Sequence, residues 1–376
     1  MLRFVCGILV CASLVQAQVE RVWVTSRRTD LSHVVVCWET AEPGESVVHY
    51  GLAKDCPREA RGSGTTVRHA VEVPLPDSGP LFYRVQTGEH ETEVVRLPDF
   101  SQDQLRLAVV GNWSSLRPLA ALQKDAPHIL LTGGDNVGRL WDGKQRGNAT
   151  NIGPYQRLID TYPELIPAVV LMPVLGNHDR EILPRGKRYP PEPTYDPQAV
   201  AFRTFFELPG DEWKWSAALP QFGIRIIALD LNHTSDMGTT WQTCHPFAAG
   251  SEQFAWFDQE TKAAREPFVI ALQNEQNSGM RGKEKGAWGN MFGRCNAVIT
   301  GFGYYGEHAE LGGTTYLNTS LSGTGAQYKD PKALFVVGQH NYLLLTVPRA
   351  GAVMSVALKG LDGAVLHALR VPARSR

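Results

Sequence analysis

The chain has 376 residues, of which 43% are hydrophobic and 20% are charged, and 37 Lys and Arg nearly balance 38 Asp and Glu. This length allows a full-sized core with a second small domain, and 9 Trp, 11 Tyr and 14 Phe argue against a disordered chain. A formal charge of −1, without a block of Lys or Arg, argues against a nucleic acid or an anionic membrane as partner.

The first seventeen residues differ in character from the rest. Arg3 precedes an apolar run from Phe4 to Val15, and a small residue, Ala17, follows two positions later. This layout is typical of a secretory signal peptide cleaved near Ala17, so we expect a secreted, periplasmic or cell-surface protein. A buried N-terminal strand is the alternative interpretation. No other run is long enough for a transmembrane segment.

Residues 18–100 contain short β-rich runs separated by Pro, Gly, Asp and Ser, which predicts a small all-β sandwich. The predicted strands are Val19–Ser26, His33–Thr40, Ser46–Leu52, Thr66–Val73, Leu81–Thr87 and Thr92–Leu97. The segment Leu75–Asp77, followed by Leu81–Val85, resembles the tyrosine-corner region of a fibronectin type III-like domain. Export permits disulfides, but the sequence leaves open whether Cys37, Cys56, Cys244 and Cys295 pair.

From residue 101 to 376, strands and helices alternate, which predicts an α/β domain with sheets covered by helices. The predicted strands are Leu105–Gly111, His128–Thr132, Val169–Leu175, Phe222–Leu229, Phe268–Leu272 and Ala297–Thr300. The predicted helices are Leu116–Lys124, Pro154–Tyr162 and Glu252–Ala264. Short strands within residues 341–372 are expected to close the domain. Pro-rich 184–197 and Gly/Thr/Trp-rich 236–247 are long loops, which often form the walls of a site.

Polar residues follow five of these predicted strands. They are Gly111–Ser114, Gly133–Asn136, Gly176–Asp179, Gln273–Asn277 and Gly301–Tyr304. Ligands of open α/β sheets bind where the carboxyl ends of the strands point, so we expect these five segments to meet in one cleft.

Gly134-Asp135 and Gly176-Asn177-His178-Asp179, spaced over strand, helix and strand, resemble the calcineurin-like metallophosphoesterases and most closely the purple acid phosphatases. The resemblance implies a four-layer αββα sandwich and a cleft for Fe, Zn or Mn. It also implies that Asp135 bridges two metals, that Asn177 binds one through its amide oxygen, and that His178 steadies or protonates a phosphoryl group while Asp179 holds its ring.

Most of the other metal ligands of this family are missing. Asn112 stands where the family has an aspartate, Gln273 is nearest to an expected histidine, and Gly301-Phe302-Gly303-Tyr304 replaces Gly-His-x-His. A second cation beside the first would be poorly compensated, at a cost of several kcal/mol. We therefore expect at most one divalent ion at Asp135 and Asn177, with Asn112 and Gln273 as degenerate positions.

The residues that replace these ligands suit a small molecule, either a phosphoester or a sugar. The candidate ligand-binding residues are Asn136, Asn274, Glu275, Tyr304 and His308. Turn capping is the alternative for 274–277, and exposed loop positions are the alternative for Glu275 and His308. Three functions stay open: a ligand-binding protein with little or no phosphatase activity, a hydrolase with an altered or single-metal site, and a scaffold with a vestigial cleft.

Overall fold

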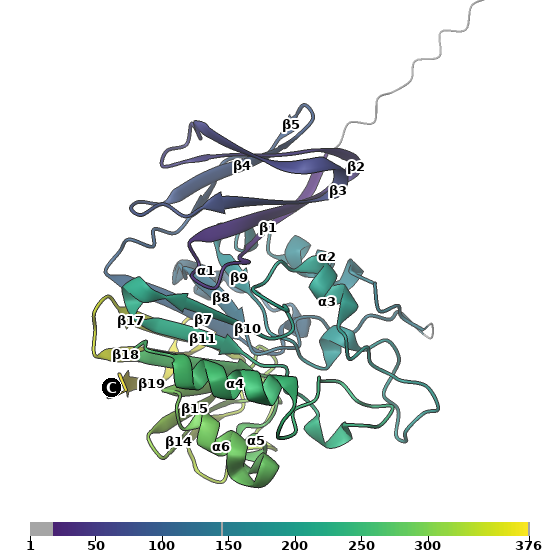
Figure 1. Cartoon of the computed structure of the whole chain (residues 1–376), viewed down its shortest axis with the longest axis vertical. Coiled ribbons are helices and arrows are strands. Elements are labelled where there is room, and N and C mark those ends of the chain that lie inside the picture. The colour runs from purple at the N-terminus through teal and green to yellow at the C-terminus, as the bar shows by residue number, and fades with distance from the viewer. Residues whose placement is uncertain (1–17, 144–145, 375–376) are drawn as a thin grey trace, which may run out of the picture.

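A computed structural model describes residues 18–143 and 146–374. The predicted signal peptide, residues 1–17, lies outside the described residues. Figure 1 shows the N-terminal strands gathered at one end of the molecule and helices α4 to α6 towards the other. Three sheets and several helices make this a mixed α/β structure.

The N-terminal sheet has six strands linked by hydrogen bonds. They are β1 (Val19–Thr25), β2 (His33–Gly51), β3 (Arg58–Pro74), β4 (Leu81–Thr87), β5 (His90–Glu91) and β6 (Val95–Leu97). The two strands predicted over 33–52 are one long strand, β2, which pairs with β1 along its first half and with β4 along its second. Hydrogen bonds link all six strands, and the predicted sandwich arrangement of this region stays a prediction.

Two further sheets form the larger part of the molecule. One contains β10 (Trp215–Leu219), β11 (Ile224–Ala228), β12 (Phe268–Gln273), β13 (Ala297–Thr300), β15 (Thr314–Asn318), β14 (Gly306–Leu311) and β16 (Ala333–Val337), in that order. The other contains β19 (Val365–Pro372), β18 (Val353–Gly360), β17 (Asn341–Pro348), β7 (Gln104–Val110), β8 (Ile129–Thr132) and β9 (Val170–Met172). Strands β7, β8 and β9 are parallel, as are β11, β12, β13 and β15.

The helices connect these strands or cover them. They are α1 (Ala120–Lys124), α2 (Gly153–Thr161), α3 (Val200–Phe205), α4 (Glu252–Ala263), α5 (Asn277–Gly282) and α6 (Ala287–Phe292). Helix α1 begins four residues later than predicted, because Leu116 has a left-handed backbone (φ 46°) and Pro118 disfavours a helical residue before it. Strand β9 ends before Pro173, which has no N–H for the ladder.

Apolar side chains fill both faces of the seven-stranded sheet. Ile226, Ile270 and Ile299 belong to the main core, whereas Ile227 and Val298 pack with residues of α4 and α6 in a second cluster. Burial on both faces explains why these strands read as continuous apolar runs in the sequence. Among the described residues no helix is long and apolar enough to span a bilayer. Cys37, Cys56, Cys244 and Cys295 are buried free thiols.

Candidate functional site

The two large sheets meet where β7, β8 and β13 end. A Cβ atom on Gly111 would lie 2.3 Å from the carbonyl oxygen of Thr319, and one on Gly133 would lie 2.4 Å from the amide nitrogen of Gly301. Only glycine allows the backbones to approach so closely. The predicted convergence of the strand ends is therefore present, and it depends on main-chain contact between the sheets.

Asparagine side chains join the sheets at this point. The Asn112 amide nitrogen donates to the carbonyl oxygens of Gly301 (2.6 Å) and Gly303 (2.5 Å) and to Ser320 Oγ (3.1 Å). The Asn274 amide nitrogen donates to the carbonyl oxygen of Gly133 (2.6 Å). These two amides stabilise the contact between the sheets as well as lining the pocket described next.

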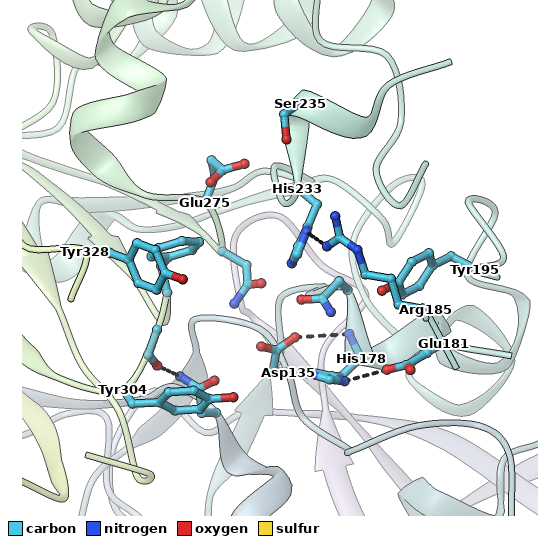
Figure 2. A pocket seen from close by; sticks show the side chains of 15 residues that line it. Asp135, His178, Glu181, Arg185, Tyr195, His233, Ser235, Glu275, Tyr304 and Tyr328 are labelled. Atoms are coloured by element: carbon cyan, nitrogen blue, oxygen red, sulfur yellow. Dashed lines mark hydrogen bonds and ion pairs between the residues drawn. The ribbon is translucent and has the colours of Figure 1, made fainter. Parts of the chain in front are cut away.

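A pocket of about 430 Å³ opens at the strand ends. Figure 2 shows Asp135 and His178 near its centre, with Tyr304 and Tyr328 on one side and Arg185 and Tyr195 on the other. Its lining includes the predicted residues Asn112, Asp135, Asn177, His178, Asn274, Glu275 and Tyr304. Seven of the residues predicted for the site therefore lie together around one pocket.

Asp135 lies in the pocket on a strained backbone. Its φ of 56° falls in the left-handed region, and its side chain is largely buried. One carboxylate oxygen accepts a hydrogen bond from the His178 amide nitrogen (3.2 Å), and the other has no hydrogen-bond partner in the described part of the chain. Asp135 can therefore accept hydrogen bonds from a ligand.

His178 is held by a glutamate that the sequence analysis did not single out. Its Nδ1 atom lies 2.8 Å from Glu181 Oε2, so the ring donates to that carboxylate and Nε2 is left for a ligand. Burial lowers the pKa of His178, but Asp135 and Glu181 outweigh it and raise the pKa to about 9. The imidazole is thus a cation and a donor at neutral pH.

Asp179 does not hold the His178 ring, so the role that the family resemblance implied for it is wrong. The Asp179 carboxylate is fully buried and accepts from the amide nitrogens of Gly176 (2.8 Å), Asn136 (3.1 Å) and Val137 (3.3 Å). Burial and the Asp135 charge raise the pKa of Asp179 to about 7, against the effect of these hydrogen bonds. Asp179 organises the turn that carries the site.

Three other predicted residues lie outside the pocket lining. Asn136 is buried and donates to the Asp179 carboxylate (3.0 Å) and the Val174 carbonyl oxygen (2.8 Å). Gln273 is buried and donates to Asn277 Oδ1 (2.8 Å). His308 lies on β14, where its Nδ1 is 3.0 Å from His367 Nε2 on β19.

A loop carrying Arg185 and a loop carrying His233 form one wall of the pocket. Arg185 hydrogen-bonds His233 Nδ1 and pairs with Asp236 (2.7 Å). Because a guanidinium only donates, His233 Nδ1 must accept, and its proton resides on Nε2. Burial and Arg185 lower the pKa of His233, so the ring is a neutral donor. Glu275 fixes this loop by accepting from the Thr234 amide nitrogen (2.8 Å) and hydroxyl (3.0 Å).

Aromatic rings form the opposite wall. Tyr304 and Tyr328 are 50% and 51% exposed, and Phe302 contacts Tyr328 edge-on with ring centroids 5.4 Å apart. Burial and the Asp135 charge raise the pKa of Tyr304, so its hydroxyl stays protonated. The wall offers flat apolar surface with a polar edge.

The side chains do not form the two-metal centre of the resembled family. Within the described ranges, no three or more His, Cys, Asp and Glu side chains gather closely enough to hold a metal ion. The Asn112 amide nitrogen is committed to three oxygens, and Gln273 lies outside the pocket. Of the oxygen ligands that the family resemblance implies, Asp135 and Asn177 remain in the pocket, and these are too few for a pair of hard cations.

Sequence reasoning missed six lining residues. They are Glu181, Arg185, Tyr195, His233, Ser235 and Tyr328. Glu181 lies three positions after His178, a spacing that brings two side chains together in a helical turn. Arg185 and Tyr195 lie in the long loop 184–197, which the sequence indicated as a wall without indicating which side chains face inward.

Comparisons with known proteins give a fold but no sequence family. No family model and no curated protein sequence matches the chain. Among solved structures, it is similar to PhoD, with a TM-score of 0.63 and 12% identity over 94% of this chain and 88% of that one. A weaker match, TM-score 0.42 and 11% identity over 73% of this chain and 90% of that one, is GAP50, the anchor in the inner membrane complex of Plasmodium. The PhoD match shows that this chain has a phosphoesterase-type fold.

Proposed function

We propose that this chain is exported and that its pocket binds a small, neutral, polyhydroxylated molecule of the sugar class, with little or no phosphatase activity. The proposal includes the four-layer αββα arrangement and the fibronectin type III-like N-terminal domain that the sequence predicted. One observation carries it: the pocket keeps hydrogen-bonding groups that no residue within 18–143 or 146–374 satisfies. These are the second oxygen of Asp135 and the Nε2 atoms of His178 and His233.

The charges in the pocket favour a neutral ligand over a phosphate. Asp135, Glu181 and Glu275 are acidic, whereas the cations are His178 and Arg185, and Arg185 is already paired with Asp236. A phosphate dianion would lie beside Asp135 without a compensating metal centre. Hydroxyl groups both donate and accept, so they suit a carboxylate flanked by two imidazole donors.

The ligand test is titration calorimetry with a panel of neutral monosaccharides and polyols. At least one should bind, and the Asp135→Asn and His178→Gln variants should weaken it by tenfold or more, about the value of one charged hydrogen bond. His308→Gln is the matched control, because His308 lies outside the pocket and its change should leave the dissociation constant unaltered. Binding of no sugar or polyol, or binding unchanged in both pocket variants, contradicts the proposal.

A phosphoester hydrolase is the second candidate, and the protonated His178 beside Asp135 favours it as a proton donor for a leaving group. Its test is turnover of p-nitrophenyl phosphate by protein purified without chelator. Steady turnover that is lost in both Asp135→Ala and His178→Ala would establish this candidate in place of sugar binding.

A further inference from the structure

An aromatic pair lies just outside the pocket, next to Arg185. The ring centroids of Tyr189 and Trp241 are 4.3 Å apart, and the Arg185 guanidinium lies 4.5 Å from the Trp241 centroid. Arg185 also lines the pocket, so the pair adjoins the pocket wall. Figure 2 shows Arg185 on the side opposite Tyr304 and Tyr328. Tyr189 is 56% exposed and does not line the pocket itself.

Hydrogen bonds fix the Trp241 ring and the two loop segments that carry the pair. The Thr194 amide nitrogen donates to the Thr240 carbonyl oxygen (3.0 Å), the Thr240 hydroxyl donates to the Pro190 carbonyl oxygen (2.8 Å), and Trp241 Nε1 donates to the Arg185 carbonyl oxygen (2.8 Å). Single exposed aromatic residues are common on protein surfaces. Tyr189 differs from such residues because its ring packs on the anchored Trp241 ring, which lowers the cost of ordering Tyr189 when a ligand stacks on it.

We propose that Tyr189, supported by Trp241, is an outer subsite that stacks a second sugar ring, so that the ligand is an oligosaccharide. This rests on the proposed function, because the first ring occupies the pocket. The C–H face of a pyranose packs on an aromatic ring while its hydroxyl groups remain in water, and tyrosine supplies both surfaces. The subsite has no need of an anionic ligand, because Asp236 already compensates the Arg185 charge (2.7 Å).

The test compares each monosaccharide of the panel with its linear oligosaccharides of two or more rings by titration calorimetry. We expect at least one oligosaccharide to bind about tenfold tighter than its monosaccharide. Tyr189→Ala should remove this gain and leave monosaccharide binding unchanged, whereas Tyr189→Phe should keep it. Leu52→Ala is the matched control, because Leu52 is also 56% exposed but lies in the N-terminal region.

The outcomes separate the two proposals. If monosaccharides bind but oligosaccharides bind no tighter, or if Tyr189→Ala keeps the gain, the outer subsite is wrong and the pocket assignment stands. If no sugar of any length binds, both proposals are wrong. Retained circular dichroism and unfolding temperature in Tyr189→Ala would show that a lost gain is due to the missing ring and not to misfolding.

Discussion

Polar side chains at the strand ends act in opposite ways on the two sides of the pocket. At the ends of β7 and β13, the Asn112 amide nitrogen is saturated by Gly301, Gly303 and Ser320. At the ends of β8 and β9, Asp135 and His178 each keep one polar atom that no described residue satisfies. One side therefore stabilises the contact between the sheets, and the other is available to a ligand.

Polar residues at the strand ends therefore divide into structural and ligand-binding ones. An asparagine at a former ligand position can stabilise the fold without any ligand, because its amide reaches the backbone of the opposite sheet. Asp135 differs because one of its carboxylate oxygens has no hydrogen-bond partner among the described residues, whereas the left-handed backbone is common to Asp135 (φ 56°) and Asn112 (φ 51°). The contrast predicts large stability effects on the first side and binding effects on the second.

The largest effect is expected for Gly133→Ala, because Gly133 follows β8 at the point where the backbones of the two sheets touch. The new Cβ would lie 2.4 Å from the Gly301 amide nitrogen and 2.8 Å from its Cα, and backbone atoms cannot move aside cheaply. We expect a loss of about 3 kcal/mol in the free energy of unfolding by urea. Gly138→Ala is the control, because its Cβ would meet Ser114 at an ordinary 3.7 Å and should change stability by less than about 0.5 kcal/mol. Equal stability of the two variants would contradict the close contact.

The next largest loss of stability is expected for Asn112→Asp. The change removes the donor to two carbonyl oxygens and sets a carboxylate oxygen against them, although it restores the acidic residue of the resembled family. We expect about 2 kcal/mol of destabilisation at neutral pH, measured by urea unfolding. Asn148→Asp is the matched control, because the exposed Asn148 only accepts, from the Thr150 amide nitrogen (2.9 Å), and aspartate can do the same. If Asn112→Asp is as stable as the parent, the Asn112 amide does not stabilise the contact between the sheets.

The third prediction concerns His128. Both of its ring nitrogens have hydrogen-bond partners, whereas His178 and His233 in the pocket each keep Nε2 for a ligand. His128 is buried, its Nδ1 accepts from the Arg106 amide nitrogen (3.1 Å), and its Nε2 lies 3.1 Å from the Asp99 carbonyl oxygen. Burial and Arg106 lower the pKa of His128 from 6.5 to about 4. Because the folded pKa is below the unfolded value, the unfolded chain binds more protons under pH 6.5. The contribution of His128 to the free energy of unfolding is therefore complete above pH 6.5 and is lost as the pH falls towards 4.

At pH 5 this loss amounts to about 2 kcal/mol for His128 alone. The measurement is urea unfolding at pH 7 and pH 5 for the parent and for His128→Gln. The difference between their two pH effects isolates His128, since the other titrating groups are present in both proteins. Among these, Glu212 and Glu307, whose pKa values burial raises to about 7, act with the opposite sign. The same pH effect in both proteins would show that His128 is not held neutral.

The sequence predicted the strand-end motifs well because they depend on local rules. Buried strands read as apolar runs, and each was followed by glycine and a polar residue, so the cluster of Asp135, Asn177 and His178 was accessible from the sequence alone. The fold class was also accessible at the level of a phosphoesterase-type fold.

Some side-chain contacts of the site were not predicted. The family resemblance implied that Asp179 holds the His178 ring, but Glu181 does so, because residues 178–180 form a single 3-10 turn that brings Glu181 against the ring. Arg185 reaches His233 across two loops, and no periodicity encodes that contact. Strand β14 was missed because it carries Glu307, His308 and Glu310, which mask the apolar pattern.

The smallest stability effect is expected for Tyr304→Ala on the open side. Tyr304 is 50% exposed and no hydrogen bond joins its hydroxyl to another described residue, so truncation leaves no buried polar group unpaired. The free energy of unfolding should change by less than about 0.5 kcal/mol, as for Leu311→Ala at a similarly exposed position (47%). Sugar binding should nevertheless weaken, because the ring forms a wall of the pocket beside Asp135. A loss of stability well above that of Leu311→Ala would make Tyr304 part of the packed structure, and the division between a structural and a ligand-binding side would then fail at this residue.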